Sequence, residues 1–265
     1  MGLFKKRETL IQNIAYMALM AAINVIFVLL TAILPPLMFL IIFVLPLTST
    51  IVTLFCKKKY FLIYFVVTIA LCLIVTSGIY IYDTFFYVIP SMISGFAFGF
   101  LIEKNVPSIY IILITSIIQY LLTFLTFIIL DAILPELNFI DALLRIFGLA
   151  EFEFKAEFVH IFLYSLSFIQ IVFTYVITKN EVKKLGFEIN LNIESELVLV
   201  IVSFSVSLFA LMFVFVYLPL TFVLVALNIP VMLYQIVELL FKKRKLYYVL
   251  LGVAFIISAI IFVAS

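Results

Sequence analysis

Residues able to do acid, base, nucleophilic or metal chemistry are few and scattered in this sequence. The single histidine, His160, lies at the entrance of an apolar segment near Glu157. A lone histidine beside a carboxylate in such a place is more often a polar anchor than a base or a metal ligand. Cys56 and Cys72 have no second pair, and no Cys-x-x-Cys, His-Glu-x-x-His or glycine-rich phosphate loop occurs. We therefore expect no catalytic residue, no metal, no cofactor and no enzymatic activity.

Amide side chains within long apolar segments are the better lead to a function. A polar group in hydrocarbon must face protein, water or a substrate, so each of them marks an interior position. Such amides commonly hydrogen-bond between helices and contribute roughly 0.6 to 2 kcal/mol each. A structural role is the expectation for each one singly, and substrate binding is the alternative. The candidates are Asn24, Gln119, Gln170, Asn228, Gln235 and, near the end of its segment, Glu238.

The apolar composition defines the elements that must position these side chains. Of the 265 residues, 68% are hydrophobic and 11% are charged. Ordinary soluble domains carry roughly 25% charged residues. The chain is therefore predicted to be an all-α, polytopic transmembrane helical bundle.

The positions of the basic residues predict the orientation of this bundle. Fourteen of the 16 Lys and Arg residues fall at five short sites separated by long apolar runs. Each interval between consecutive sites holds two crossings, since a helix needs about 20 apolar residues to span the bilayer. All five sites are thus expected on one side, and cytoplasmic loops are rich in Lys and Arg. The sites predicted to be cytoplasmic are residues 5–7, 57–59, 104, 179–184 and 242–245.

About nine spans follow from this pattern, with the N-terminus in the cytoplasm and the C-terminus outside. Residues 135–157 are predicted to lie outside and to contain a short amphipathic helix over 139–147 at the outer surface. Residues 181–196 are predicted to form a solvated inner linker. The domains are then a transmembrane half over 1–134, an extracellular amphipathic segment over 135–158 and a second transmembrane half over 159–265. The predicted spans are 10–33, 37–56, 60–79, 84–102, 109–133, 159–178, 197–216, 219–240 and 246–265.

Small residues at helical spacing predict close helix contacts. Ala15, Ala18 and Ala22 form one stripe, and Gly95 and Gly99 form another. Small side chains four residues apart let two helix backbones approach closely. Each stripe would serve either packing within the bundle, which is the commoner use, or packing against a helix of a partner protein.

Two stretches of the first half carry a family resemblance. Residues 18–24, Ala-Leu-Met-Ala-Ala-Ile-Asn, precede a proline turn and a second span that ends in a basic loop. This arrangement resembles the N-terminal region of the substrate-binding S components of energy-coupling factor (ECF) transporters. Residues 90–104, with Gly95 and Gly99, are similar to later helices of the same fold.

The second half looks like a different group of proteins. Residues 178–186 and 234–245 are similar to the YybS-like family of uncharacterised bacterial multi-pass membrane proteins. That family has an S-component-like N-terminal half and would cover nearly the whole chain. This sequence departs from it at Gln235, which is followed by Ile236 where the family usually has Gln-Gly.

The resemblance implies a membrane subunit that binds a small molecule in a cavity open to the outside. Ala18 and Ala22 would contact a membrane coupling subunit, and ATPases on other chains would supply energy. Carboxylates and aromatic rings at outer span ends would line the cavity, although a solvated loop is their commoner setting. The candidate substrate-binding residues are Asp83, Tyr87, Gln119, Asp131, His160 and Gln170.

A different reading is a non-transporting scaffold or regulator of envelope proteins, with the inner basic loops as its contact surface. An intramembrane enzyme acting on lipid is the weakest reading, because the sequence offers scattered amides rather than a convergent acid, base or nucleophile. The expected partners are the lipid bilayer, a coupling subunit with ATPases and a small-molecule ligand, with no nucleic acid. The expected location is the plasma (inner) membrane.

Overall fold

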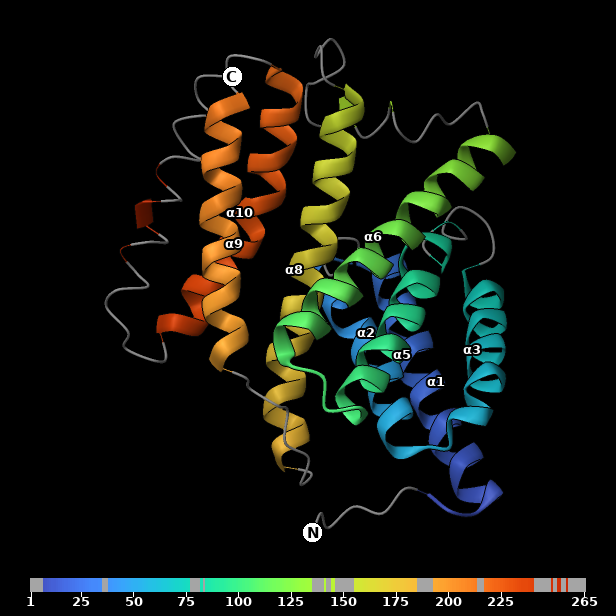
Figure 1. Ribbon diagram of the computed structural model, residues 1–265. Helices are drawn as coiled ribbons and strands as arrows, with labels where there is room; N and C mark the ends of the chain where they lie inside the picture. Colours follow the sequence, from blue (N-terminus) through green and yellow to red (C-terminus); the bar gives the residue numbers. More distant parts are fainter. Residues whose placement is uncertain are drawn as a thin grey trace. The chain divides into compact units, whose positions relative to one another are not determined.

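The computed structural model confirms the all-α prediction for the residues that it describes. Every regular element within them is helical (Figure 1). The described residues are 7–34, 38–76, 82, 84–134, 141, 144–145, 155–184, 193–213, 217–240, 249, 252–253 and 256.

The helix bounds match seven of the predicted spans to within four residues, and the helix Lys155–Lys184 extends six residues beyond the end of its predicted span 159–178. The ninth, 246–265, lies almost entirely outside the described residues, so the count of nine stays a prediction. The elements are α1 (Leu10–Ile33), α2 (Met38–Phe55), η2 (Lys58–Tyr60), α3 (Phe61–Val75), η3 (Thr84–Val88), α5 (Ile89–Glu103), α6 (Ser108–Ile133), α8 (Lys155–Lys184), α9 (Ile193–Phe213) and α10 (Leu218–Leu240).

Among the described residues, five helical stretches are long and apolar enough to cross a membrane. Shorter apolar stretches lie in α2, α9 and α10. Together they make this a membrane protein built as a helical bundle. The five stretches are Leu10–Thr31, Lys58–Val75, Thr84–Glu103, Ser108–Ile133 and Phe158–Lys179.

The prediction of a linker over 181–196 is too long at both ends. Helix α8 continues to Lys184, and α9 already begins at Ile193. Glu and Lys are good helix formers, so α8 continues through Glu181 and Lys183 although its apolar stretch has ended. Residues 185–192 of the linker lie outside the described part.

The chain divides into two units, each described by itself. Unit 1 contains residues 1–133 and 170–191, and unit 2 contains 134–169 and 192–265. In unit 1, α1 packs against α2 and α3, α2 packs most extensively against α5, and α5 packs against α6. In unit 2, α9 packs against α10 (Figure 1).

Helices α2 and α5 approach closely because α5 presents glycine to α2. A Cβ atom at Gly95 would overlap the Pro46 carbonyl oxygen, and one at Gly99 would lie 2.9 Å from the Thr50 carbonyl oxygen. The Thr50 hydroxyl also donates to the Gly95 carbonyl at 3.1 Å. The glycine stripe is therefore occupied by α2 of this same chain, so the partner helix of Gly95 and Gly99 is internal.

Among the described residues, many large apolar side chains are exposed, and many uncharged polar side chains are buried beside the apolar core. Leu62 and Ile74 on α3 are 69% and 71% exposed, whereas Asn24 and Thr68 are completely buried. This differs from a soluble domain, where exposed apolar patches are small. It is the arrangement expected when the surrounding solvent is hydrocarbon, because lipid tails solvate leucine as well as a protein core does.

Asn13 fixes the chain at one end of unit 1. Its Nδ2 donates to the carbonyl oxygens of Arg7 and Thr9 at 2.9 and 2.7 Å. Its Oδ1 accepts the backbone N–H of Lys57 at 2.8 Å. One buried amide thus joins the start of α1 to the segment that follows α2.

Basic residues of the first three basic sites lie at this end of unit 1. The Lys57 ammonium donates to the Glu8 carbonyl at 2.7 Å, and Lys58 pairs with Glu103 at 2.7 Å, one residue before Lys104. The sequence predicts that the basic sites at 5–7, 57–59 and 104 face the same side of the membrane. Sites on one side must lie at the same end of the helices, and these contacts meet that requirement.

Candidate functional site

Asn24 forms the centre of a hydrogen-bonded network across three helices. Its Nδ2 donates to the Tyr64 hydroxyl at 3.1 Å, and its Oδ1 accepts from the Thr48 hydroxyl at 2.8 Å. All three side chains are buried, on α1, α3 and α2 respectively. Asn24 therefore holds these helices together, which is the structural role expected of it.

Unit 2 contains a second network of this kind between α9 and α10. Asn228 donates to the Ser203 carbonyl at 2.8 Å and to the Ser207 hydroxyl at 3.0 Å. Gln235, almost two turns further along α10, donates to the Ser203 hydroxyl at 3.1 Å. These two amides also connect helices. The side chain of Glu238 lies outside the described part of the chain.

Gln170 connects α8 to α5 within unit 1. Its Nε2 donates to the Ser91 hydroxyl at 2.8 Å, and both residues are buried. Ser91 is the eighth residue of its span Thr84–Glu103, and Gln170 is the thirteenth of Phe158–Lys179. The bond therefore lies well inside the membrane-spanning part of both helices.

Gln119 differs from the buried amides that bond to a second helix. It is 3% exposed, yet its hydrogen bond, at 3.5 Å, goes to Thr123 on its own helix. Its Oε1 has no hydrogen-bond partner among the residues that the structure describes, and neither has Oγ of Ser116 one turn earlier. Both side chains belong to α6, and Gln119 is the twelfth residue of a 26-residue span. Ser116 and Gln119 together are the candidate site.

Ser49, Thr178 and Gln235 also carry a buried atom without a partner among the described residues, but Ser116 and Gln119 lie one turn apart on the same helix. A buried polar atom without a partner costs about 1–3 kcal/mol. Hydrocarbon supplies no alternative donor or acceptor at mid-membrane depth. A ligand that bonded to Ser116 and Gln119 would recover that free energy.

Of the predicted residues at the outer span ends, three lie among the described residues. Tyr87 lies half-buried in η3, a π-helical turn before α5, and Asp131 lies half-buried near the end of α6. His160 is half-buried in the first turns of α8, which belong to unit 2. Asp83 lies outside the described residues. Tyr87, Asp131, Gln119 and Gln170 share unit 1.

Most of the predicted amphipathic segment over 135–158 lies outside the described residues. Of its residues, Asp141, Leu144 and Arg145 are described and helical. Leu144 is buried and Arg145 is exposed.

The alanine stripe on α1 has the opposite environment to the glycine stripe on α5. Ala15, Ala18 and Ala22 are all exposed. No helix of the described part covers them, so this face of α1 is open to lipid or to another protein.

Sequence reasoning missed the hydroxyl groups that complete these networks. Thr48, Tyr64, Ser203 and Ser116 gave no separate signal, because Ser and Thr are common in membrane helices and usually bond to their own backbone. The one usable signal was spacing, since Ser116 precedes Gln119 by one helical turn.

Metal and thiol chemistry find no support in the described residues. Among them, no three His, Cys, Asp or Glu side chains lie close enough together to hold a metal ion. Cys56 and Cys72 are free thiols and both are buried.

Comparisons with known protein families, with curated proteins and with solved structures found no match to this chain.

Proposed function

We propose that this membrane protein binds a small, uncharged polar molecule within unit 1, as a transport subunit that relies on ATPases of other chains. The observation that carries the proposal is the pair of buried, unpaired atoms on α6, Oγ of Ser116 and Oε1 of Gln119. The other buried amides of unit 1 whose bonds are described connect helices, whereas Gln119 bonds within its own turn.

The chemistry of the interior sets the ligand class. The polar side chains that are buried among the described residues are Ser, Thr, Asn and Gln, and none of them is charged. A charged ligand would therefore lack a compensating charge, which is costly in a low-dielectric interior. A carbonyl oxygen such as Oε1 of Gln119 accepts hydrogen bonds, so the ligand offers an N–H or O–H donor.

The exposed stripe on α1 supports the partner component of the proposal. The ECF resemblance implies that Ala18 and Ala22 contact a membrane coupling subunit. Their side chains are exposed in this chain, together with that of Ala15. Small exposed side chains let a partner helix approach the α1 backbone closely.

The test is to identify what the purified protein carries. Protein purified in mild detergent is denatured, and the released small molecules are identified by mass spectrometry. The Gln119→Leu variant should release none of the compound found with wild type. It should also be as stable as wild type or more stable, because an unpaired amide is replaced by an apolar side chain of similar size.

The matched control is Asn228→Leu. It also removes a buried amide, but one in unit 2 whose hydrogen bonds are internal. This variant should lose stability and keep the compound. A compound retained by Gln119→Leu, or lost equally from both variants, would contradict the assignment to α6.

The scaffold reading has one observation in its favour. Asn24, Gln170 and Asn228 each form hydrogen bonds between helices, so most of the intramembrane amides have a structural role. Wild-type protein that released no small molecule while copurifying with other envelope proteins would favour the scaffold.

A further inference from the structure

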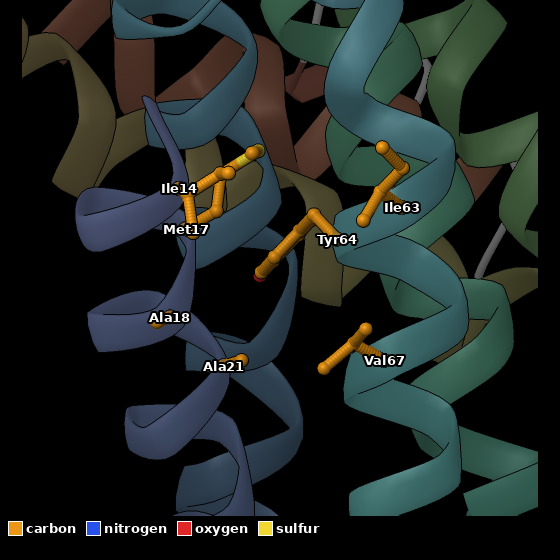
Figure 2. Close-up of a pocket in the computed structure, with 7 residues that line it drawn as sticks. All are labelled: Ile14, Met17, Ala18, Ala21, Ile63, Tyr64 and Val67. Atoms are coloured by element: carbon orange, nitrogen blue, oxygen red, sulfur yellow. The ribbon is translucent and has the colours of Figure 1, made fainter. Parts of the chain in front are cut away.

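A narrow apolar groove lies between α1 and α3 of unit 1 (Figure 2). Its volume is about 80 Å³. Ligand pockets measure roughly 300–1,000 Å³, so this groove is too small to be the small-molecule site proposed above. Its lining is almost wholly apolar, which suits an aliphatic chain. In Figure 2 the α1 side chains face those of α3, and the lining residues are Ile14, Met17, Ala18, Ala21, Ile63, Tyr64 and Val67.

The groove lies at the depth of the inner lipid leaflet. At 1.5 Å per residue, Ile14 to Ala21 are about 6 to 17 Å from the start of α1, and Ile63 to Val67 are about 3 to 9 Å from the start of α3. Half of the hydrocarbon core is roughly 15 Å thick. Both helices start at the predicted cytoplasmic end, so the groove fits the acyl region of that leaflet.

The rim of the groove is exposed to the lipid phase. Ile14 on α1 is 49% exposed, and Ile63 and Val67 on α3 are 55% and 46% exposed. Both helices are among the stretches apolar enough to span a membrane. A lipid chain can therefore enter from the side without crossing protein.

Cationic side chains lie at the cytoplasmic mouth of the groove. Lys59 precedes Ile63 by four residues and Val67 by eight, and η2 continues directly into α3. That spacing places the three side chains on one helix face. Lys59 and Lys57 are both exposed.

The balance of charge at this end is positive. Within residues 7–104, the described carboxylates at this end are Glu8 and Glu103, and Glu103 pairs with Lys58. The described cations that outnumber them are Arg7, Lys57, Lys58, Lys59 and Lys104.

We propose that the groove is a specific site for an anionic phospholipid of the inner leaflet, with one acyl chain between α1 and α3 and the phosphate against Lys57 and Lys59. Charge complementarity selects this occupant over an uncharged lipid. The acyl chain is already in hydrocarbon before it binds, so the groove only fixes its position by packing. The two lysines supply the preference for an anionic over an uncharged headgroup. Each lysine near an anionic headgroup is expected to give roughly fivefold in affinity, and the pair roughly 30-fold.

The experiment titrates the full-length protein in mild detergent with dioleoylphosphatidylglycerol or dioleoylphosphatidylcholine. Native mass spectrometry counts the bound lipids. Wild type should bind phosphatidylglycerol roughly 30-fold more tightly at one site, and K57Q/K59Q should lose that preference. The control K104Q removes an exposed cation at the same end, beside Phe100 on α5. This variant should keep the preference for phosphatidylglycerol.

The groove itself is tested by filling it. In the purified protein, with no coupling subunit bound, V67F should abolish the tightly held phosphatidylglycerol without altering the alanine stripe. A18F should do the same from the other wall, and either variant suffices if the other fails to fold. A132F puts the same side chain on an exposed position near the end of α6 and should leave the lipid bound.

Three results would overturn the proposal. Equal affinity of wild type for the two lipids would remove the charge argument. Loss of the preference in K57Q/K59Q with full retention in A18F and V67F would place the lipid at the lysines but outside the groove. A dimer of this chain that A18F dissociates would assign the groove to a second copy instead.

Discussion

Gly95→Ala is expected to separate α2 from α5 and to destabilise the fold. The new Cβ would overlap the Pro46 carbonyl oxygen and lie 2.9 Å from Cβ of Ser49. One obstacle is backbone, so a helix has to shift rather than a side chain rotate. The shift would also strain the bond of 3.1 Å from the Thr50 hydroxyl to the Gly95 carbonyl.

The magnitude follows from two opposing effects. Overpacking of a tight interior costs typically about 1–3 kcal/mol. Replacing Gly by Ala inside a helix recovers up to about 1 kcal/mol of helix propensity. We expect Gly95→Ala to lower the free energy of unfolding by about 1–2 kcal/mol.

The assay is reversible unfolding in mixed micelles with increasing dodecyl sulfate, followed by far-ultraviolet circular dichroism. Tryptophan fluorescence is not an option, because the chain has no Trp. The control is Gly252→Ala, since a Cβ at Gly252 meets no atom within 4 Å. A Gly95→Ala protein as stable as the Gly252→Ala protein would refute the close contact of α2 with α5.

Three further substitutions probe individual contacts by the same unfolding measurement. Asn24→Leu leaves the Tyr64 hydroxyl without its amide partner and should cost about 1–2 kcal/mol, so an unchanged stability would argue against the network. Asn13→Ala removes three hydrogen bonds at the start of α1 and should cost about 2–3 kcal/mol. A loss smaller than that of Asn24→Leu would count against its anchoring role. Lys58→Met should lower the free energy of unfolding by less than about 1 kcal/mol, because the ion pair with Glu103 is about 30% exposed. A larger loss would mean that solvent screens the pair less than its exposure indicates.

The positions of the spans were predictable because a run of apolar residues marks the hydrocarbon solvent around it, whatever the helix packs against. Long apolar runs bounded by Lys predicted α1, α2 and α6 to within a few residues. The error over 181–196 arose where that signal stops, since helix can continue into water and hydropathy does not report it.

The environment of a given residue type was not predictable. Gln119 and Gln170 are both mid-span glutamines in the sequence, yet Gln170 bonds to Ser91 on another helix and Gln119 bonds within α6. The difference depends on how each helix is rotated about its axis. That rotation results from many weak contacts along the helix and not from the amide itself.

The two small-residue stripes show the same division between sequence and structure. By itself, the sequence determined a membrane-embedded helical chain, because apolar length is a local property. It also predicted close helix contacts at Ala18–Ala22 and at Gly95–Gly99 from side-chain size, and the structure confirms the contact at the glycines. The tertiary structure alone decided that α2 covers the glycines while the alanines stay exposed. Which face of a helix is covered depends on the helices packed around it, and their positions follow from contacts between residues far apart in the chain.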